Sequence, residues 1–266
     1  MGNPLDDLQY AVMTDGRWRD GRFPKVFLDG HELDLAACKG PIEGERALIL
    51  GAHGKNLHDL LARVTVDTLG ICDSRAEDFS GLARLSGLRR LDIRYVTRLT
   101  DISCLRGLKH LETLVFYEPG KLTDISPIAA LENLTAFEFS GGISAVARAD
   151  SLAPIGALKR LEMLRLLNLR VTDGGLRPLA GCESLACLDV SNQFETADYA
   201  YLSVMLPDTE CALFRPYTDL ECKIGDSDVM VTGLRKPFLN AKRDAARLAR
   251  YVEAFELLRA EARAGR

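Results

Sequence analysis

The sequence predicts an α/β solenoid, an arc of about seven coils of 22–27 residues with a parallel sheet on its concave face and a cap at each end. Two observations predict this fold. The pattern LxxLxxLxxLxL recurs along the chain, and LTDISCLRGLKHLETLVF (99–116) returns 23 residues later as LTDISPIAALENLTAFEF (122–139). An apolar pattern that returns at a fixed interval of about 20–50 residues indicates one structural unit stacked on copies of itself.

The fourth apolar position of the pattern sets the register of the coils. It falls at 69, 91, 114, 137, 164, 188 and 211, which gives spacings of 22, 23, 23, 27, 24 and 23 residues. The LxL pair alternates as a half-buried strand does, whereas the preceding apolar residues recur every three, as in a short 3₁₀ turn. The first and last copies are degenerate because Arg63 and Asp208 each break one apolar position.

The chain divides into three parts on this pattern. Residues 1–58 are predicted to form an N-terminal capping region of short strands, in which ALIL (47–50) is a candidate further repeat strand. Residues 59–214 form the solenoid, and residues 215–266 form a C-terminal cap with a strand at 228–232 and an amphipathic helix at 241–262. Asn240 is the expected N-cap of this helix. The residues of its expected buried face are Ala245, Leu248, Val252, Phe255 and Leu258. We expect this face to cover the last coil, with partner docking as the alternative.

The repeated strings resemble the short repeats of bacterial leucine-rich repeat proteins, including the internalins, over about residues 60–213. The resemblance implies a leucine-rich repeat arc in a bacterial protein and no particular function, because that superfamily binds many unrelated partners. The family usually carries Asn three residues after the LxL pair. This chain instead has Ser74, Val96, Pro119, Gly142, Leu169 and Gln193. The turn after each strand is therefore expected to satisfy its main chain in another way.

Composition favours a soluble cytoplasmic protein. The 266 residues have a net charge of −4, which gives no global attraction to nucleic acid or anionic membrane. The N-terminus has no signal-peptide pattern, and no apolar stretch has the length of a membrane span. The seven cysteines are an odd number without CxxC spacing, and several occupy apolar repeat positions. This pattern favours free thiols in a reducing compartment.

No motif for catalysis or for a cofactor is present. The glycine pairs at 141–142 and 174–175 lie in turns between coils rather than in a nucleotide-binding loop. His53, His58 and Asp59 lie near one another, but their spacing matches no familiar zinc pattern. We therefore predict a non-enzymatic protein without metal or cofactor. An enzyme with its site around His53 and His58 is the least favoured hypothesis.

The residues that flank the LxL positions should project from the concave face of the sheet. Their mixture of charged, aromatic and aliphatic side chains resembles a protein-binding surface more than a sugar or phosphate site. We predict that another protein or a peptide binds there, the alternative being a solvated face without a ligand. The predicted binding residues are Arg90, Asp92, Arg94, Thr113, Val115, Tyr117, Glu138, Ser140, Met163, Arg165, Leu167, Asp189 and Ser191.

Two other features compete with this surface. Residues 82–110 are rich in arginine and could bind nucleic acid or an acidic partner, although their different repeat positions favour a scattered, solvated arrangement. The coil between Phe137 and Leu164 carries about four extra residues in SGGISAVARAD (140–150). Such an insertion is either a functional loop or neutral.

Overall fold

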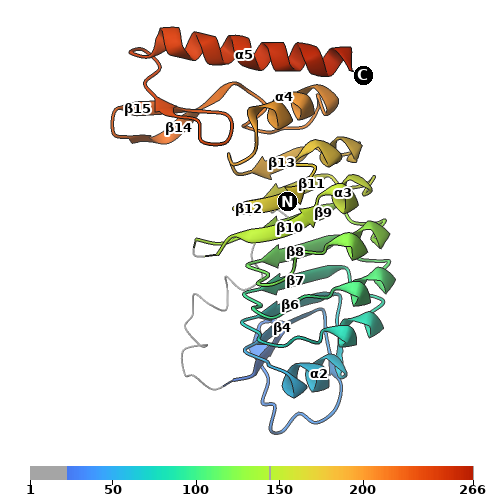
Figure 1. Ribbon diagram of the computed structural model, residues 1–266. Helices are drawn as coiled ribbons and strands as arrows, with labels where there is room; N and C mark the ends of the chain where they lie inside the picture. Colours follow the sequence, from blue (N-terminus) through green and yellow to red (C-terminus); the bar gives the residue numbers. More distant parts are fainter. Residues whose placement is uncertain (1–22, 144, 266) are drawn as a thin grey trace.

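The computed structural model describes residues 23–143 and 145–265, so residues 1–22 of the predicted N-terminal cap (1–58) lie outside the described residues. The chain forms a stack of coils with strands along one side and short helical turns along the other (Figure 1). The predicted leucine-rich repeat solenoid is confirmed.

One nine-stranded sheet runs the length of the stack. Six successive pairings from β4 to β13 are parallel and in register, so that Leu69, Leu91, Leu114, Phe137 and Leu164 are cross-strand neighbours. β4 contains the ALIL string and pairs with β6 as a further coil, as the sequence suggested. β1 and β2 close this end in antiparallel fashion. The strands are β1 (Lys25–Leu28), β2 (His31–Glu32), β4 (Arg46–Leu50), β6 (Thr68–Cys72), β7 (Arg90–Arg94), β8 (Thr113–Tyr117), β9 (Ala136–Ser140), β11 (Met163–Leu166) and β13 (Cys187–Val190).

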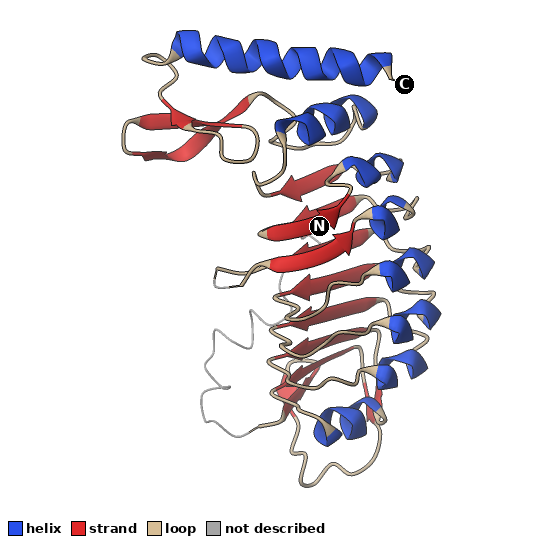
Figure 2. Cartoon of the chain, viewed as in Figure 1, coloured by secondary structure: helices blue, strands red, loops and turns tan. Residues whose placement is uncertain are grey.

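Short helical turns form the opposite side of the stack (Figure 2). Three of them begin next to an aspartate whose carboxylate accepts a main-chain N–H two residues on, as Asp101 does from Ser103 at 2.7 Å. This contact satisfies an N–H that the turn leaves without a main-chain partner. The turns are α2 (Lys55–Leu61), η2 (Ser80–Arg84), η3 (Ser103–Gly107), η4 (Ser126–Ala130), α3 (Ala153–Gly156), η5 (Arg177–Gly181) and α4 (Thr196–Met205).

The leucine positions of all coils merge into one continuous core. Leu91, Leu114, Phe137 and Leu164 are completely buried, and Cys182 fills a leucine position as predicted. All seven cysteines lie in the described residues and none forms a disulfide. Burial raises the pKa of Cys104 to about 11 and that of Cys182 to about 12, so these thiols stay protonated and unreactive at neutral pH.

Main-chain contacts, rather than an asparagine ladder, join neighbouring coils. The carbonyl of Arg89 accepts the N–H groups of both Glu112 and Thr113, and the carbonyls of Asp67, Thr135 and Glu162 are used in the same way. After the strands, Gly51, Asp73, Tyr95, Glu118 and Asn168 adopt positive φ angles. Four of these residues, all except Asn168, donate their N–H to the next strand at 2.8–3.1 Å. In turns without the asparagine that is usual in leucine-rich repeats, main-chain hydrogen bonds from a residue in the left-handed conformation thus join the turn to the next strand.

The coil with the extra residues of the 140–150 segment contains a strand on the face of the stack that lies opposite the nine-stranded sheet. We call this face the outer face. β10 (Ala147–Ser151) pairs in parallel with β12 (Leu169–Asp173) of the next coil. A smaller pair of β3 (Ile42–Glu43) and β5 (Val64–Thr65) lies nearer the N-terminus. Residues 147–151 of this coil are therefore part of the outer surface.

The C-terminal cap consists of a three-stranded sheet and a long helix that lies across the end of the stack (Figure 1). The strands are β14 (Tyr217–Ile224), β15 (Ser227–Val231) and β16 (Phe238–Leu239), and the helix is α5 (Ala245–Ala264). Phe255 joins the main core, so the helix covers the last coil.

Two details of the predicted C-terminal helix are wrong. Ala245 and Val252 are exposed because the helix buries only a narrow stripe, with Leu248 and Phe255 buried and Leu258 half-buried. The Asn240 side chain accepts the N–H groups of Lys242 and Arg243, so it caps the turn that precedes α5 rather than the helix itself.

Candidate functional site: the concave sheet face

The alternation of the strands gives the direction of the predicted binding residues correctly. Asp92, Val115 and Glu138 are in-register neighbours on β7, β8 and β9, between core positions that point the other way. We call the surface that they share the sheet face. It extends from β1 to β13, and its surroundings change along that length.

At β7 the sheet face contains a buried carboxylate between two arginines. Asp92 is fully buried, and its Oδ1 accepts a hydrogen bond from Arg94 Nε at 2.7 Å. Arg90 Nη2 lies 3.6 Å from Asp92 Oδ2. A buried charge is tolerated only when it is paired and hydrogen-bonded, so this group holds the three side chains in a fixed arrangement.

The middle of the sheet face is apolar and aromatic. Val115 and Ala136 are buried and contact the half-buried side chains of Tyr117 and Met163. The Tyr117 ring meets Tyr95 edge-on at a centroid distance of 5.4 Å, and the Arg94 guanidinium carbon lies 5.5 Å from the Tyr117 ring centroid. Tyr117 therefore links this apolar patch to the charged group at β7.

A second charged group spans β9, β11 and β13. Arg165 Nη1 lies 3.4 Å from Glu138 Oε2, and Arg165 Nε donates to Asp189 Oδ2 at 3.0 Å. Burial raises the pKa of Glu138 despite the opposing effect of Arg94 and Arg165. Asp189 is exposed whereas Glu138 is buried, so Arg165 connects the interior of the sheet face to solvent.

The expectation that all thirteen residues present themselves to solvent is wrong for six of them. Long side chains such as Arg94 and Arg165 bend onto neighbouring carboxylates. The Ser140 hydroxyl accepts the N–H of Leu167 in the next coil, and the Ser191 hydroxyl accepts the N–H of Asn168 in the preceding coil. The buried residues are Asp92, Arg94, Thr113, Val115, Glu138 and Ser140. The half-buried residues are Arg90, Tyr117, Met163, Arg165, Leu167 and Ser191, and Asp189 is exposed.

The basic residues of 82–110 do not form one patch. Arg84 donates to the carbonyls of Leu61 and Val64 in the preceding coil, and Lys109 donates to that of Ala130. Acidic side chains pair with Arg89, Arg90, Arg94 and Arg98, as Glu112 does with Arg89 at 2.6 Å. Most of this positive charge serves contacts between coils and lies on several faces, as the repeat positions predicted.

The histidines near the N-terminal end have separate places. His53 Nδ1 accepts the main-chain N–H of Arg75, and His58 lies on α2. Within residues 23–143 and 145–265 no group of three or more His, Cys, Asp or Glu side chains could hold a metal ion. No helix in the described part of the chain has the length and apolarity required to cross a bilayer.

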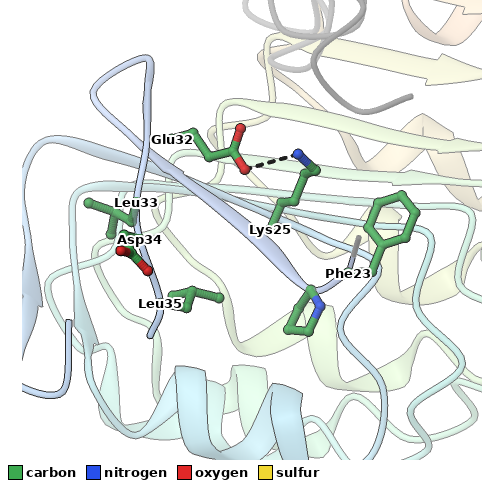
Figure 3. Close-up of a pocket in the computed structure, with 7 residues that line it drawn as sticks. Phe23, Lys25, Glu32, Leu33, Asp34 and Leu35 are labelled. Atoms are coloured by element: carbon green, nitrogen blue, oxygen red, sulfur yellow. Dashed lines mark hydrogen bonds and ion pairs between the residues drawn. The ribbon is translucent and has the colours of Figure 1, made fainter. Parts of the chain in front are cut away.

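A pocket that the sequence did not predict lies beside β1 and β2 (Figure 3). It has a volume of about 520 Å³, and the Lys25–Glu32 ion pair at 2.9 Å lies in its wall. The Asp34 carboxylate is occupied by the N–H of Ala36. The lining residues are Phe23, Pro24, Lys25, Glu32, Leu33, Asp34 and Leu35. Because the charged side chains of the pocket already have partners, they indicate no particular ligand. In the sequence, the pocket could have been located only by recognising that β1 and β2 form a hairpin.

The repeat pattern and the stacked coils define a protein of leucine-rich repeat architecture. Its solved structural neighbours include internalin C2 of Listeria monocytogenes, with 21% identity, a TM-score of 0.47 and coverage of 61% of this chain and 68% of that one. An internalin of the same organism, inlF, has 24% identity, a TM-score of 0.46 and coverage of 59% and 45%. Toll in the Drosophila Toll–Spatzle complex has 20% identity, a TM-score of 0.45 and coverage of 62% and 23%.

The match thus spans 45% of inlF and 23% of the Toll chain. No protein-family model matches the chain, and no curated protein matches it either.

Proposed function

We propose that this chain is a non-enzymatic, cytoplasmic protein-interaction module that holds a partner protein or peptide against the C-terminal part of the sheet face. Its role would be that of an adaptor, an inhibitor or immunity factor, or a recognition subunit. The partner contact would be centred on β11 and β13, where the predicted binding residues are half-buried or exposed.

The observation that carries this proposal is the arrangement around Arg165. Its guanidinium is held between Glu138 and Asp189, with the half-buried Met163 and Leu167 on the same strand and its extension. Arginine, tyrosine and methionine are enriched at protein interfaces. Side chains already fixed by neighbours lose little conformational freedom when a partner binds, which favours affinity.

A site-specific photocrosslinker tests this assignment in the native host. We would replace Leu167 with a photoreactive amino acid and use Leu257, an exposed apolar residue on α5, as the matched control position. The proposal expects one defined protein adduct from position 167 and none from position 257, identified by mass spectrometry. Adducts from position 257 alone would place the partner on the C-terminal helix and refute the sheet face.

Point variants then measure the contribution of individual residues. Tyr117→Ala and the charge reversal Arg165→Glu should weaken binding of the crosslinked partner while the circular dichroism spectrum stays native. Glu138 is a poorer probe because it is buried and its replacement also perturbs the fold. Partner affinity that survives both substitutions would contradict the proposal.

A further inference from the structure

The outer face carries a row of basic residues at equivalent places in five successive coils. Arg75 follows Ser74, whose carbonyl accepts the N–H of Thr97, which Arg98 follows. Lys121 lies two residues before Thr123 as Arg148 lies two residues before Asp150, and Asp150 N–H donates to the Thr123 carbonyl at 3.0 Å. Arg148 and Arg170 are direct neighbours across β10 and β12. We call this set the outer basic row: Arg75, Arg98, Lys121, Arg148 and Arg170.

The positive charges of this row are largely uncompensated. Arg98 lies 3.3 Å from Glu77, and both side chains are well exposed. Within the described residues, the other four side chains make no ion pair, although all four are exposed. Like charges directly opposite each other on neighbouring strands are destabilising. The Arg148–Arg170 pair therefore costs stability that the fold does not require.

Two exposed aliphatic side chains, Ile143 and Val146, precede Arg148 in the chain. Ile143 is completely exposed, and Val146 projects from the same side of the chain as Arg148 because Ala147 between them is buried. The loop is tied to the next coil, since Asn168 Nδ2 donates to the Gly142 carbonyl at 2.7 Å and Gly141 N–H donates to the Leu167 carbonyl. Gly141 and Gly142 are thus held against the next coil, and two exposed aliphatic side chains lie between them and the arginine pair in the sequence.

We propose that the outer face from Lys121 to Arg170, together with Ile143 and Val146, binds an acidic protein segment that carries an aliphatic side chain. The carboxylates of the segment would pair with Lys121, Arg148 and Arg170, and its aliphatic group would cover Ile143 and Val146. This surface lies opposite the sheet face and is independent of the partner proposed there.

The charges around the row favour a protein segment over nucleic acid or lipid. Asp124 and Asp150 lie on the same outer coils as Lys121 and Arg148. Hydrogen bonds from Ser126 lower the pKa of Asp124, so this carboxylate stays ionised. A phosphate backbone or a headgroup layer is uniformly anionic and would be repelled there. A polypeptide can place acidic residues over the cations and neutral residues over the carboxylates.

Fluorescence anisotropy with a labelled peptide of alternating glutamate and leucine tests this assignment on the full chain. The expected result is saturable binding that weakens about tenfold in the double variant Arg148→Glu/Arg170→Glu, equivalent to about 1.4 kcal/mol. Ile143→Ser should weaken binding by a smaller factor. The matched control Arg247→Glu/Arg250→Glu makes the same change of net charge on the exposed side of α5 and should leave affinity unchanged.

Three outcomes would overturn the inference. Absence of saturable peptide binding, or equal binding of a peptide with glutamine in place of glutamate, removes the acidic partner. Equal weakening in the α5 control variant shows that net charge alone acts. Stronger binding of single-stranded DNA of equal charge, or of vesicles of phosphatidylcholine with phosphatidylserine, assigns the row to a phosphate-bearing ligand instead. Crosslinking from Leu167 is unaffected by any of these results, so the two proposals fail separately.

Discussion

The sheet face and the outer basic row both carry a line of arginines, but they treat the charges differently. On the sheet face Arg90, Arg94 and Arg165 each lie against a carboxylate. On the outer face Arg148 and Arg170 lie against each other. The difference follows from solvent: a buried charge without a partner is very costly, whereas water screens an exposed one. Pairing on the sheet face thus stabilises buried charge, whereas four of the five cations of the outer basic row make no ion pair within the described residues.

The largest effect should come from removing the buried carboxylate of the sheet face. Asp92→Ala would remove the buried carboxylate that Arg90 and Arg94 contact, and loss of one member of a buried ion pair costs about 3–5 kcal/mol. Urea unfolding followed by circular dichroism measures this change. Asp173→Ala on exposed β12 is the control and should shift stability by less than about 0.5 kcal/mol. Equal midpoints for both variants would show that the two faces do not differ in this respect.

A pH-dependent effect should appear at Glu138. Burial raises its pKa in the folded state above the ordinary value of 4.5, so the folded chain binds this proton more tightly than the unfolded chain. That contribution is fully present below the unfolded pKa and is lost as pH rises through the folded pKa. Glu138→Gln stays neutral throughout, so its stability relative to the unmodified chain should rise as the pH increases from the unfolded pKa through the folded pKa.

Glu183 gives the opposite sign and serves as the control for this measurement. Its pKa is lowered by the hydrogen bond from Lys159, so its contribution is present above the unfolded pKa and lost as pH falls. Glu183→Gln should therefore lose stability relative to the unmodified chain as pH rises from the folded pKa to the unfolded pKa, a range that lies below the one in which Glu138 acts. The same slope for both variants would contradict the difference between buried and exposed carboxylates.

A smaller effect, with a gain in stability, is expected on the outer face. Arg170→Glu replaces a like-charge neighbour of Arg148 with an opposite charge, which should stabilise the chain by about 0.2–1 kcal/mol. Thermal unfolding of this variant beside Arg247→Glu on α5 separates the local contact from net charge. If both variants melt at the same temperature, the arginine pair carries no strain.

The smallest effect should occur where the sheet face reaches solvent. Asp189→Ala removes an exposed partner of Arg165, which keeps its contact with Glu138, so stability should change by less than about 0.5 kcal/mol. Parallel urea titrations with Asp92→Ala place the two ends of the sheet face on one scale. A loss comparable to that of Asp92→Ala would mean that the exposed end is as dependent on pairing as the buried end.

The sequence predicted the parts of the fold that depend on apolar periodicity. The in-register pairing of Leu91, Leu114, Phe137 and Leu164 follows from the spacing alone, because each coil can bury its leucines only against the next one. The same reasoning located the ALIL strand. The pairing of β10 with β12 was not predictable, because the apolar repeat does not show that the coil with four extra residues forms a second strand, which pairs with a strand of the next coil.

For the candidate site, the sequence predicted on which face of the sheet the side chains lie but not how exposed they are to solvent. Alternation along β7 places Asp92 away from the core, yet it cannot show that Arg94 bends over it. The outer basic row was also hidden, because insertions shift the spacing and only cross-coil contacts align Lys121 with Arg148. The α5 helix shows the same limit, since a five-residue apolar pattern buried only part of its length.

The doubly used carbonyls at the start of each strand make the coils interchangeable units. Because Arg89 and Glu112 hold the next coil through main-chain atoms, the joint does not depend on which side chains stand there. Leu99 and Leu122 lie at the same point of successive coils, so excision of residues 100–122 would rejoin equivalent ends. The architecture can thus change its length one coil at a time, which lets a lineage resize its binding surface without redesigning any junction.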